Sequence, residues 1–243
     1  MAARRQGRDR RLRDPHSLTT GAPGIGQNAP PLPIRAVICD FGGVLTSPLL
    51  GAFAAFQDDT GVSLEQLGRA MEVGAGHLDG KHPLFELECG RISEERFLDL
   101  LRDGLQAELG HRPALHRFKE TYFDALVPNA EMIDLMAELR DRGLRMAMLT
   151  NNVREWEPLW RAKLPVDQIF ETVVDSAFVG MRKPDHEIYE LTVSRLDGIQ
   201  AEECLFIDDT EVNCEAAREL GMAAVHFREN EQAIPEIRSL LDG

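Results

Sequence analysis

Short hydrophobic runs alternate with amphipathic stretches along most of the chain from residue 34 onward. Five of these runs have the length and the continuous apolar character of strands that are buried on both faces of a parallel sheet. They are RAVICD, RMAMLTNN, ETVVDS, ECLFIDD and AAVHF, at residues 35–40, 145–152, 171–176, 203–209 and 223–227. Helix-like segments such as AEMIDLMAELRDRG and EVNCEAARELG lie between them. The pattern predicts an α/β fold with a doubly wound parallel sheet.

The alternation of strands and helices is interrupted between residues 48 and 127. This segment is rich in helix-like patterns, of which FAAFQDDTG, LEQLGRAME and SEERFLDLLRDGL are the clearest. Ser93 is predicted to start the last of them, because a serine followed by acidic residues and an apolar stripe is typical of a helix start. We therefore expect residues 34–47 and 128–243 to form the α/β core. Residues 48–127 should form an all-helical cap over the carboxyl ends of the strands.

The first 33 residues lack this periodicity and end in proline and glycine, which predicts a disordered basic tail. With six Arg and two Asp the tail carries 6 − 2 = +4, so the remainder of the chain carries −14 − 4 = −18. An acidic body disfavours a general nucleic-acid surface, because such surfaces bind phosphates through Lys and Arg. No apolar run approaches the roughly 18 residues of a membrane span. We expect a soluble protein that binds neither nucleic acid nor membrane.

The cysteine and aromatic positions indicate less about fold and function. The cysteines, at positions 39, 89, 204 and 214, form no CxxC pair, which favours reduced thiols and a cytoplasmic location over disulfides or a zinc site. Trp156 and Trp160 are interpreted as packing or as partner surface. Phe53 and Phe56 are interpreted as either substrate entrance or helix core. The sequence does not decide between a monomer and a homodimer.

Polar side chains follow three of the predicted strands at the point where each strand ends. Asp40 follows the first strand, Thr150 and Asn151 end the second, and Asp208 and Asp209 end the fourth. Because the carboxyl ends of parallel strands meet at one edge of a sheet, we expect these side chains to lie close together. Three neighbouring carboxylates are costly unless a hard cation lies among them. Mg²⁺ fits, because it prefers oxygen ligands.

Lys183 lies in the loop after the third predicted strand, where Pro184 stiffens the chain. It can place a fixed positive charge near the acids, while the Thr150 hydroxyl and the following backbone amides can donate hydrogen bonds to an anion. A carboxylate nucleophile surrounded by a metal, a lysine and a hydroxyl is typical of phosphoryl transfer. The expected partner is a small phosphorylated substrate.

Four motifs in this order resemble those of the haloacid dehalogenase-like hydrolases. They are DFGGVL from Asp40, LTNN around Thr150, KP at Lys183 and FIDDTEVN ending at Asn213. The stretches VGMRKPDHEIYE and FIDDTEVNCEAARELGM are most similar to the phosphatase domain at the amino terminus of soluble epoxide hydrolases and of some acyl-CoA dehydrogenase fusions. The resemblance implies a Rossmann-like core, a helical cap and Mg²⁺-dependent hydrolysis of a phosphorylated metabolite through an aspartyl-phosphate.

The resemblance also implies metal ligands. Asp40 would be the nucleophile and a Mg²⁺ ligand, and Gly42 would bind the metal through its carbonyl oxygen. Asp209 would be the direct metal ligand of the acidic pair, because it aligns with the first acid of the family's GDxxxD form. Asp208 would then be a catalytic residue that orients its neighbours, although the sequence leaves the choice between the two acids open.

The remaining roles concern the phosphate. By the same resemblance, Thr150 and Asn151 would bind the phosphate group. Lys183 would contact both the phosphate and the nucleophile, and so would be at once a catalytic and a substrate-binding residue.

Gly42 departs from the family pattern. Most phosphatases of this family have a second Asp at this position, which protonates the leaving alcohol. Losing a general acid typically costs about 10²- to 10⁴-fold in rate, and least for good leaving groups such as sugar 1-phosphates, acyl phosphates or aryl phosphates. Asp208, His77 or His82 could replace the missing acid, but surface or packing roles are the simpler interpretation of both histidines.

Two other functions stay open because of Gly42. A 2-haloacid dehalogenase would use Asp40 against carbon without a metal, but the acidic pair and Lys183 count against it. A non-catalytic phosphate-binding or regulatory protein would not need the nucleophile that Asp40 supplies.

Overall fold

Five parallel strands form one sheet in the order β3-β2-β1-β4-β5. They are β1 (Ala36–Cys39), β2 (Arg145–Thr150), β3 (Thr172–Asp175), β4 (Cys204–Asp208) and β5 (Ala223–His226). Each lies within one of the five predicted runs, so these predictions are confirmed. The central strand β1 pairs with both neighbours, and Ile38 lies opposite Ala147 of β2 and Phe206 of β4.

The computed structural model describes residues 33–48, 57–58, 60–113, 115 and 118–242, and these belong to one unit of the chain. The predicted tail therefore lies outside the described residues, apart from Pro33, and so do Phe53 and Phe56. No helix within the described ranges is long and apolar enough to cross a membrane. All four cysteines are described, buried and free.

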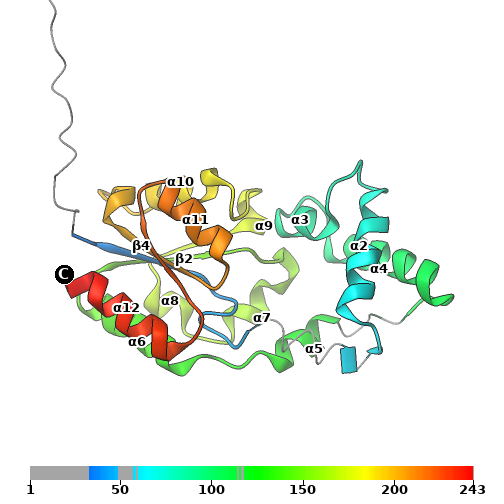
Figure 1. Cartoon of the computed structure of the whole chain (residues 1–243), viewed down its shortest axis with the longest axis horizontal. Coiled ribbons are helices and arrows are strands. Elements are labelled where there is room, and N and C mark those ends of the chain that lie inside the picture. The colour runs from blue at the N-terminus through cyan, green and yellow to red at the C-terminus, as the bar shows by residue number, and fades with distance from the viewer. Residues whose placement is uncertain (1–32, 49–56, 59, 114, 116–117, 243) are drawn as a thin grey trace, which may run out of the picture. The chain divides into compact units, whose positions relative to one another are not determined.

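Helices cover both faces of the sheet, because successive strand residues point to opposite faces. Val37 and Cys39 of β1 join one apolar cluster, and Ala36 and Ile38 join another. Figure 1 shows one helix pair on each face. The pairs are α6 (Ala130–Asp141) with α12 (Asn230–Asp242), and α10 (His186–Ser194) with α11 (Glu211–Glu219). The doubly wound α/β fold predicted from the sequence is confirmed.

A helical insertion separates β1 from α6 and β2, as the interrupted pattern predicts. The helices that the structure describes in it are α2 (Leu64–Ala75), α3 (Pro83–Glu88), α4 (Glu94–Leu109) and α5 (Phe118–Ala125). The predicted start of α4 is confirmed, since the Ser93 side chain accepts a hydrogen bond from the Arg96 amide. The cap limits at residues 48 and 127 remain predictions.

Short helical segments fill connections at both the carboxyl and the amino edges of the sheet. They are the 3₁₀ segments η1 (Arg154–Trp156) and η2 (Ala201–Glu203), and the helices α7 (Glu157–Arg161), α8 (Val166–Ile169) and α9 (Ser176–Val179). Trp160 of α7 is fully buried, with its ring centroid 5.5 Å from that of Phe41 just after β1. This contact confirms the packing interpretation of Trp160.

Candidate active site

The carboxyl edge of the sheet brings three predicted site residues together. Asp40 follows β1 directly, and its amide extends the ladder by donating to the Ile207 carbonyl of β4 at 2.9 Å. Thr150 and Asp208 are the last residues of β2 and β4, the strands on either side of β1. All three side chains are buried. The strand ends therefore form one polar floor, as the parallel sheet requires.

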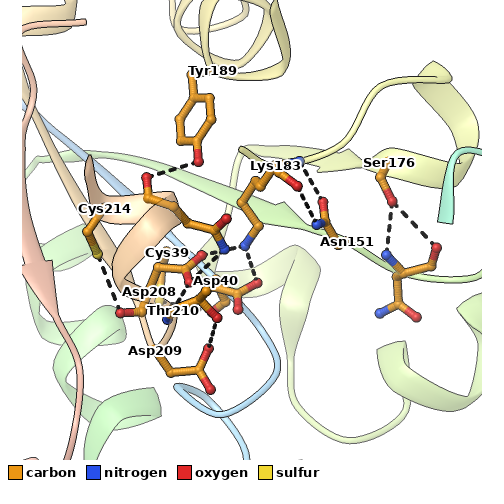
Figure 2. A network of polar contacts seen from close by, with 12 residues as sticks. Cys39, Asp40, Asn151, Ser176, Lys183, Tyr189, Asp208, Asp209, Thr210 and Cys214 are labelled. Atoms are coloured by element: carbon orange, nitrogen blue, oxygen red, sulfur yellow. Dashed lines mark hydrogen bonds and ion pairs between the residues drawn. The ribbon is translucent and has the colours of Figure 1, made fainter. Parts of the chain in front are cut away.

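Lys183 lies between two of these carboxylates. Its Nζ is 2.7 Å from Asp40 Oδ1 and 2.6 Å from Asp208 Oδ2 (Figure 2). Burial alone would lower the pKa of Lys183, but the charges of Asp208 and Asp40 outweigh it and raise this pKa well above its ordinary value. Lys183 is therefore a fixed cation, and it orients the Asp40 carboxylate.

Asn151 holds the Lys183 backbone in place. Its side-chain amide donates to the Lys183 carbonyl at 3.0 Å and accepts from the Lys183 amide at 2.8 Å. Both functional groups of this side chain are thus used within the protein. The predicted contact of Asn151 with phosphate remains a prediction.

The two adjacent acids differ in how their oxygens are used. Asp208 Oδ1 accepts from the Thr210 amide at 2.8 Å and from Asn213 Nδ2 at 2.9 Å, while its Oδ2 contacts Lys183. Asp209 has a weaker contact, with Thr210 Oγ1 at 3.3 Å from its Oδ1, and its side chain is only partly buried. Asp208 is therefore locked by its neighbours, whereas Asp209 keeps oxygen lone pairs available.

The acidic set fits a hard cation. One carboxylate oxygen from each of Asp40, Asp208 and Asp209 lies within 4.8 Å of the others. Burial raises the pKa of Asp40, the charge of Lys183 opposes this shift, and the charges of Asp208 and Asp209 add to it. Burial and the charge of Asp208 also raise the pKa of Asp209. One lysine does not balance three carboxylates, so a divalent cation with oxygen ligands would relieve the repulsion.

Gly43 sets the position of Asp209, a role that the sequence reading missed. A Cβ atom at Gly43 would lie 2.0 Å from Asp209 Oδ2, and the Gly43 φ of +80° is also unfavourable for other residues. The second glycine of DFGG therefore leaves the space that the Asp209 carboxylate occupies.

A cavity of about 540 Å³ lies above this floor. Its floor includes Asp40, Gly42, Thr150, Lys183 and Asp209. Its opposite wall comes from α2, α3, α4 and α5 of the described part of the insertion, through Leu67, Met71, Leu84, Phe85, Glu88, Phe97, Leu101, Tyr122 and Phe123. The cavity thus joins a charged floor to a mainly apolar wall.

The predictions for Trp156, His77 and His82 can be compared with the positions of these residues relative to the cavity. Trp156 lines it, and its Nε1 donates to Glu94 Oε1 at 2.9 Å, so Trp156 both packs and faces the cavity. His77 is exposed, and neither His77 nor His82 is among the described residues that line the cavity. Burial lowers the pKa of His82, whose ring packs on Phe85. The positions favour packing or surface roles for both histidines.

Glu88 and Arg182 form an ion pair that the sequence reading did not find. Arg182 Nε donates to Glu88 Oε2 at 2.8 Å, and the Arg182 guanidinium lies 3.9 Å from the centroid of the Phe85 ring. The pair joins α3 of the insertion to the loop that carries Lys183. Only the position of Arg182 next to Lys183 in the sequence could have indicated it.

A family model described as haloacid dehalogenase-like hydrolase matches residues 34–221. The chain belongs to this family. The resemblance stated from the four motifs is thereby confirmed, and the protein is a haloacid dehalogenase-like hydrolase with an α/β core and a helical cap.

Individual members of the family give more detail. Sesquiterpene phosphatase astK of Aspergillus oryzae is 30% identical over 216 residues, which cover 85% of this chain and 96% of that protein. Acyl-CoA dehydrogenase family member 10 of Mus musculus is 34% identical over 219 residues, which cover 85% of this chain but only 19% of that protein. A haloacid dehalogenase family enzyme of Bacteroides thetaiotaomicron, solved with magnesium and inorganic phosphate, matches with a TM-score of 0.61 and 25% identity over 80% of this chain and 94% of its own.

Proposed function

We propose that this hydrolase is a Mg²⁺-dependent phosphatase of a small phosphorylated molecule, with Asp40 as the nucleophile. The observation that carries the proposal is the contact of Lys183 with both Asp40 and Asp208, with Asp209 beside them on the cavity floor. The phosphatase among the relatives and the magnesium and phosphate in the Bacteroides structure support it.

In the first step, the Asp40 oxygen that does not contact Lys183 attacks phosphorus. An Asp40–phosphate bond forms, and the bond from phosphorus to the substrate alcohol oxygen breaks, so that this oxygen leaves with the electron pair. The Thr150 hydroxyl and the Asn151 backbone N–H would donate to the phosphoryl oxygens, and Lys183 would stabilise their charge. These groups bind the phosphate where negative charge develops.

Asp40, Asp209 and the Gly42 carbonyl would hold Mg²⁺, which supplies positive charge to the phosphoryl oxygens when bound. Asp208 would stay out of direct ligation, because both of its oxygens already accept hydrogen bonds. Its task would be to position Lys183.

The second step regenerates the enzyme. Water attacks phosphorus, the Asp40–phosphate bond breaks, and inorganic phosphate leaves while the water proton passes to solvent. Gly42 provides no side chain to protonate the leaving alcohol, so that oxygen takes its proton from water. We therefore expect good leaving groups to react fastest.

Release of para-nitrophenol from its phosphate ester, with Mg²⁺ and with a chelator, tests the proposal. Asp40→Asn should lose about 10⁴-fold in kcat or more without a change in circular dichroism. Asp124→Asn, at an exposed position of α5, is the matched control and should keep wild-type turnover. Wild-type turnover by Asp40→Asn would refute the nucleophile. Halide release from 2-haloacids without phosphate release would identify a dehalogenase, and phosphate binding without turnover a binding protein.

A cytoplasmic location belongs to the same proposal. All four cysteines are buried and free, which is typical of proteins of reducing compartments.

A further inference from the structure

The cavity has two chemically different sides. Its charged and hydrogen-bonding side chains come almost entirely from the strand ends and the loops that follow them. On the described part of the insertion wall the polar side chains are Tyr122 and Glu88, and the Glu88 carboxylate is bound by Arg182. The part of a substrate beyond its phosphate would therefore lie against hydrocarbon.

We propose that the substrate is a phosphate monoester of a mainly hydrocarbon alcohol, such as an alkyl, isoprenoid or alkylaryl alcohol, whose chain packs against the helical insertion. This inference rests on the proposed phosphatase function, because the charged floor would hold the phosphate and the apolar wall the remainder.

The apolar wall extends along the helices α2 and α4. Leu67 and Met71 are four residues apart on α2, and Phe97 and Leu101 are four residues apart on α4, so each pair lies on one face of its helix. Because α2 packs on α4, these two pairs lie side by side in the cavity wall. Phe85 also lines the cavity and is 42% exposed, so the apolar lining continues outward.

A polar substrate would fit this wall poorly. Each sugar hydroxyl or base nitrogen buried there without a partner would lower the affinity about tenfold. Each buried methylene would instead raise the affinity up to about fourfold. The cavity volume of about 540 Å³ also leaves room for a molecule larger than a triose phosphate.

Phenyl phosphates with a para-alkyl chain test the inference, because the leaving group stays nearly constant while the chain grows. We expect kcat/KM for phosphate release with Mg²⁺ to rise at least tenfold from phenyl phosphate to 4-butylphenyl phosphate. Relative to phenyl phosphate, kcat/KM should rise less for 4-(2-hydroxyethyl)phenyl phosphate than for 4-propylphenyl phosphate, which has a chain of the same length. All substrates are kept below their critical micelle concentrations.

A matched pair of variants locates the effect. Met71→Gln places an amide on the wall and should reduce the ratio of kcat/KM for 4-butylphenyl over phenyl phosphate at least fivefold. Val73→Gln makes a similar exchange at a 45% exposed position of the same helix, outside the cavity lining, and should leave this ratio unchanged.

The outcomes separate the two proposals. Hydrolysis of phenyl phosphate without any gain from the alkyl chain would overturn the hydrocarbon substrate and leave the phosphatase standing. A gain that Met71→Gln and Val73→Gln affect equally would overturn the role of the wall. No phosphate release from any of these esters, in the presence of Mg²⁺, would overturn the phosphatase and this inference with it.

Discussion

The charged floor and the apolar wall enclose the same cavity but are built in different ways. On the floor, Lys183 and Asp208 have directed contacts of 2.6 to 3.0 Å on every side. On the wall, side chains such as Met71 and Leu101 meet their neighbours only through apolar contact. A directed network specifies one geometry, whereas an apolar surface accepts many shapes. The floor is therefore suited to a fixed reaction and the wall to the choice of substrate.

The comparison predicts opposite responses to mutation. A change on the floor should alter the rate with every substrate, because every substrate brings the same phosphate. A change on the wall should alter the ratio between substrates. Gly43→Ala tests the floor, where we expect the largest effect. Gly42→Asp adds a side chain between floor and wall and should alter both rate and ratio. Asp175→Asn tests a strand end outside the cavity lining.

Gly43→Ala should have the largest effect. Its Cβ would occupy the place of Asp209 Oδ2, at 2.0 Å, so the Asp209 carboxylate must move away from Asp40. We expect the Mg²⁺ concentration for half-maximal activity to rise at least tenfold and kcat to fall about 100-fold with all substrates, since displacing catalytic groups by about 1 Å can cost this much. Metal titration of para-nitrophenyl phosphate hydrolysis measures both.

Gly80→Ala is the control for the stability that is lost when alanine replaces a glycine of positive φ. Gly80 has a similar φ of +83°, but a Cβ atom there meets nothing within 4 Å. The two variants should therefore lose similar stability, while only Gly43→Ala should change the metal dependence. An unchanged metal titration for Gly43→Ala would contradict the position of Asp209 as a ligand.

Gly42→Asp should act between floor and wall, where the proposed mechanism places the leaving oxygen. It restores the acid that most phosphatases of the family have, so it should raise kcat/KM for alkyl phosphates about tenfold or more. It should change hydrolysis of para-nitrophenyl phosphate much less, because that leaving group needs little protonation. Equal gains for both esters would show that the new carboxyl acts by another route, such as metal binding.

The sequence predicted the floor far better than the wall, for a physical reason. Asp40, Thr150 and Asp208 end continuous buried runs, and a parallel sheet aligns such ends whatever the rest of the chain does. Glu88 and Arg182 are 94 positions apart and meet only through the packing of α3 on the core. The use of the Asn151 side chain to hold Lys183, and the space left by Gly43, likewise depend on distances that no local pattern contains.

Asp175 provides a smaller comparison within the same edge of the sheet. It ends β3 and lies opposite Thr150, but unlike Asp40 and Asp208 it has no ion pair with any described residue. Burial raises the pKa of Asp175 to about 6, although its Oδ1 accepts from the Ala177 amide at 2.9 Å. The folded protein therefore binds a proton more tightly than the unfolded chain between about pH 4 and pH 6.

This sign means that Asp175 lowers the stability as the pH rises through that window. Asp175→Asn keeps an oxygen for the Ala177 amide and removes the buried charge. We expect it to be about 1 kcal/mol more stable than the wild type at pH 7.5, with a difference that shrinks toward pH 4.5. Urea unfolding at several pH values, with the exposed Asp124→Asn as control, measures this difference. A difference in stability that grew on acidification would mean that the fold stabilises the charged form of Asp175. That result would contradict the raised pKa of Asp175.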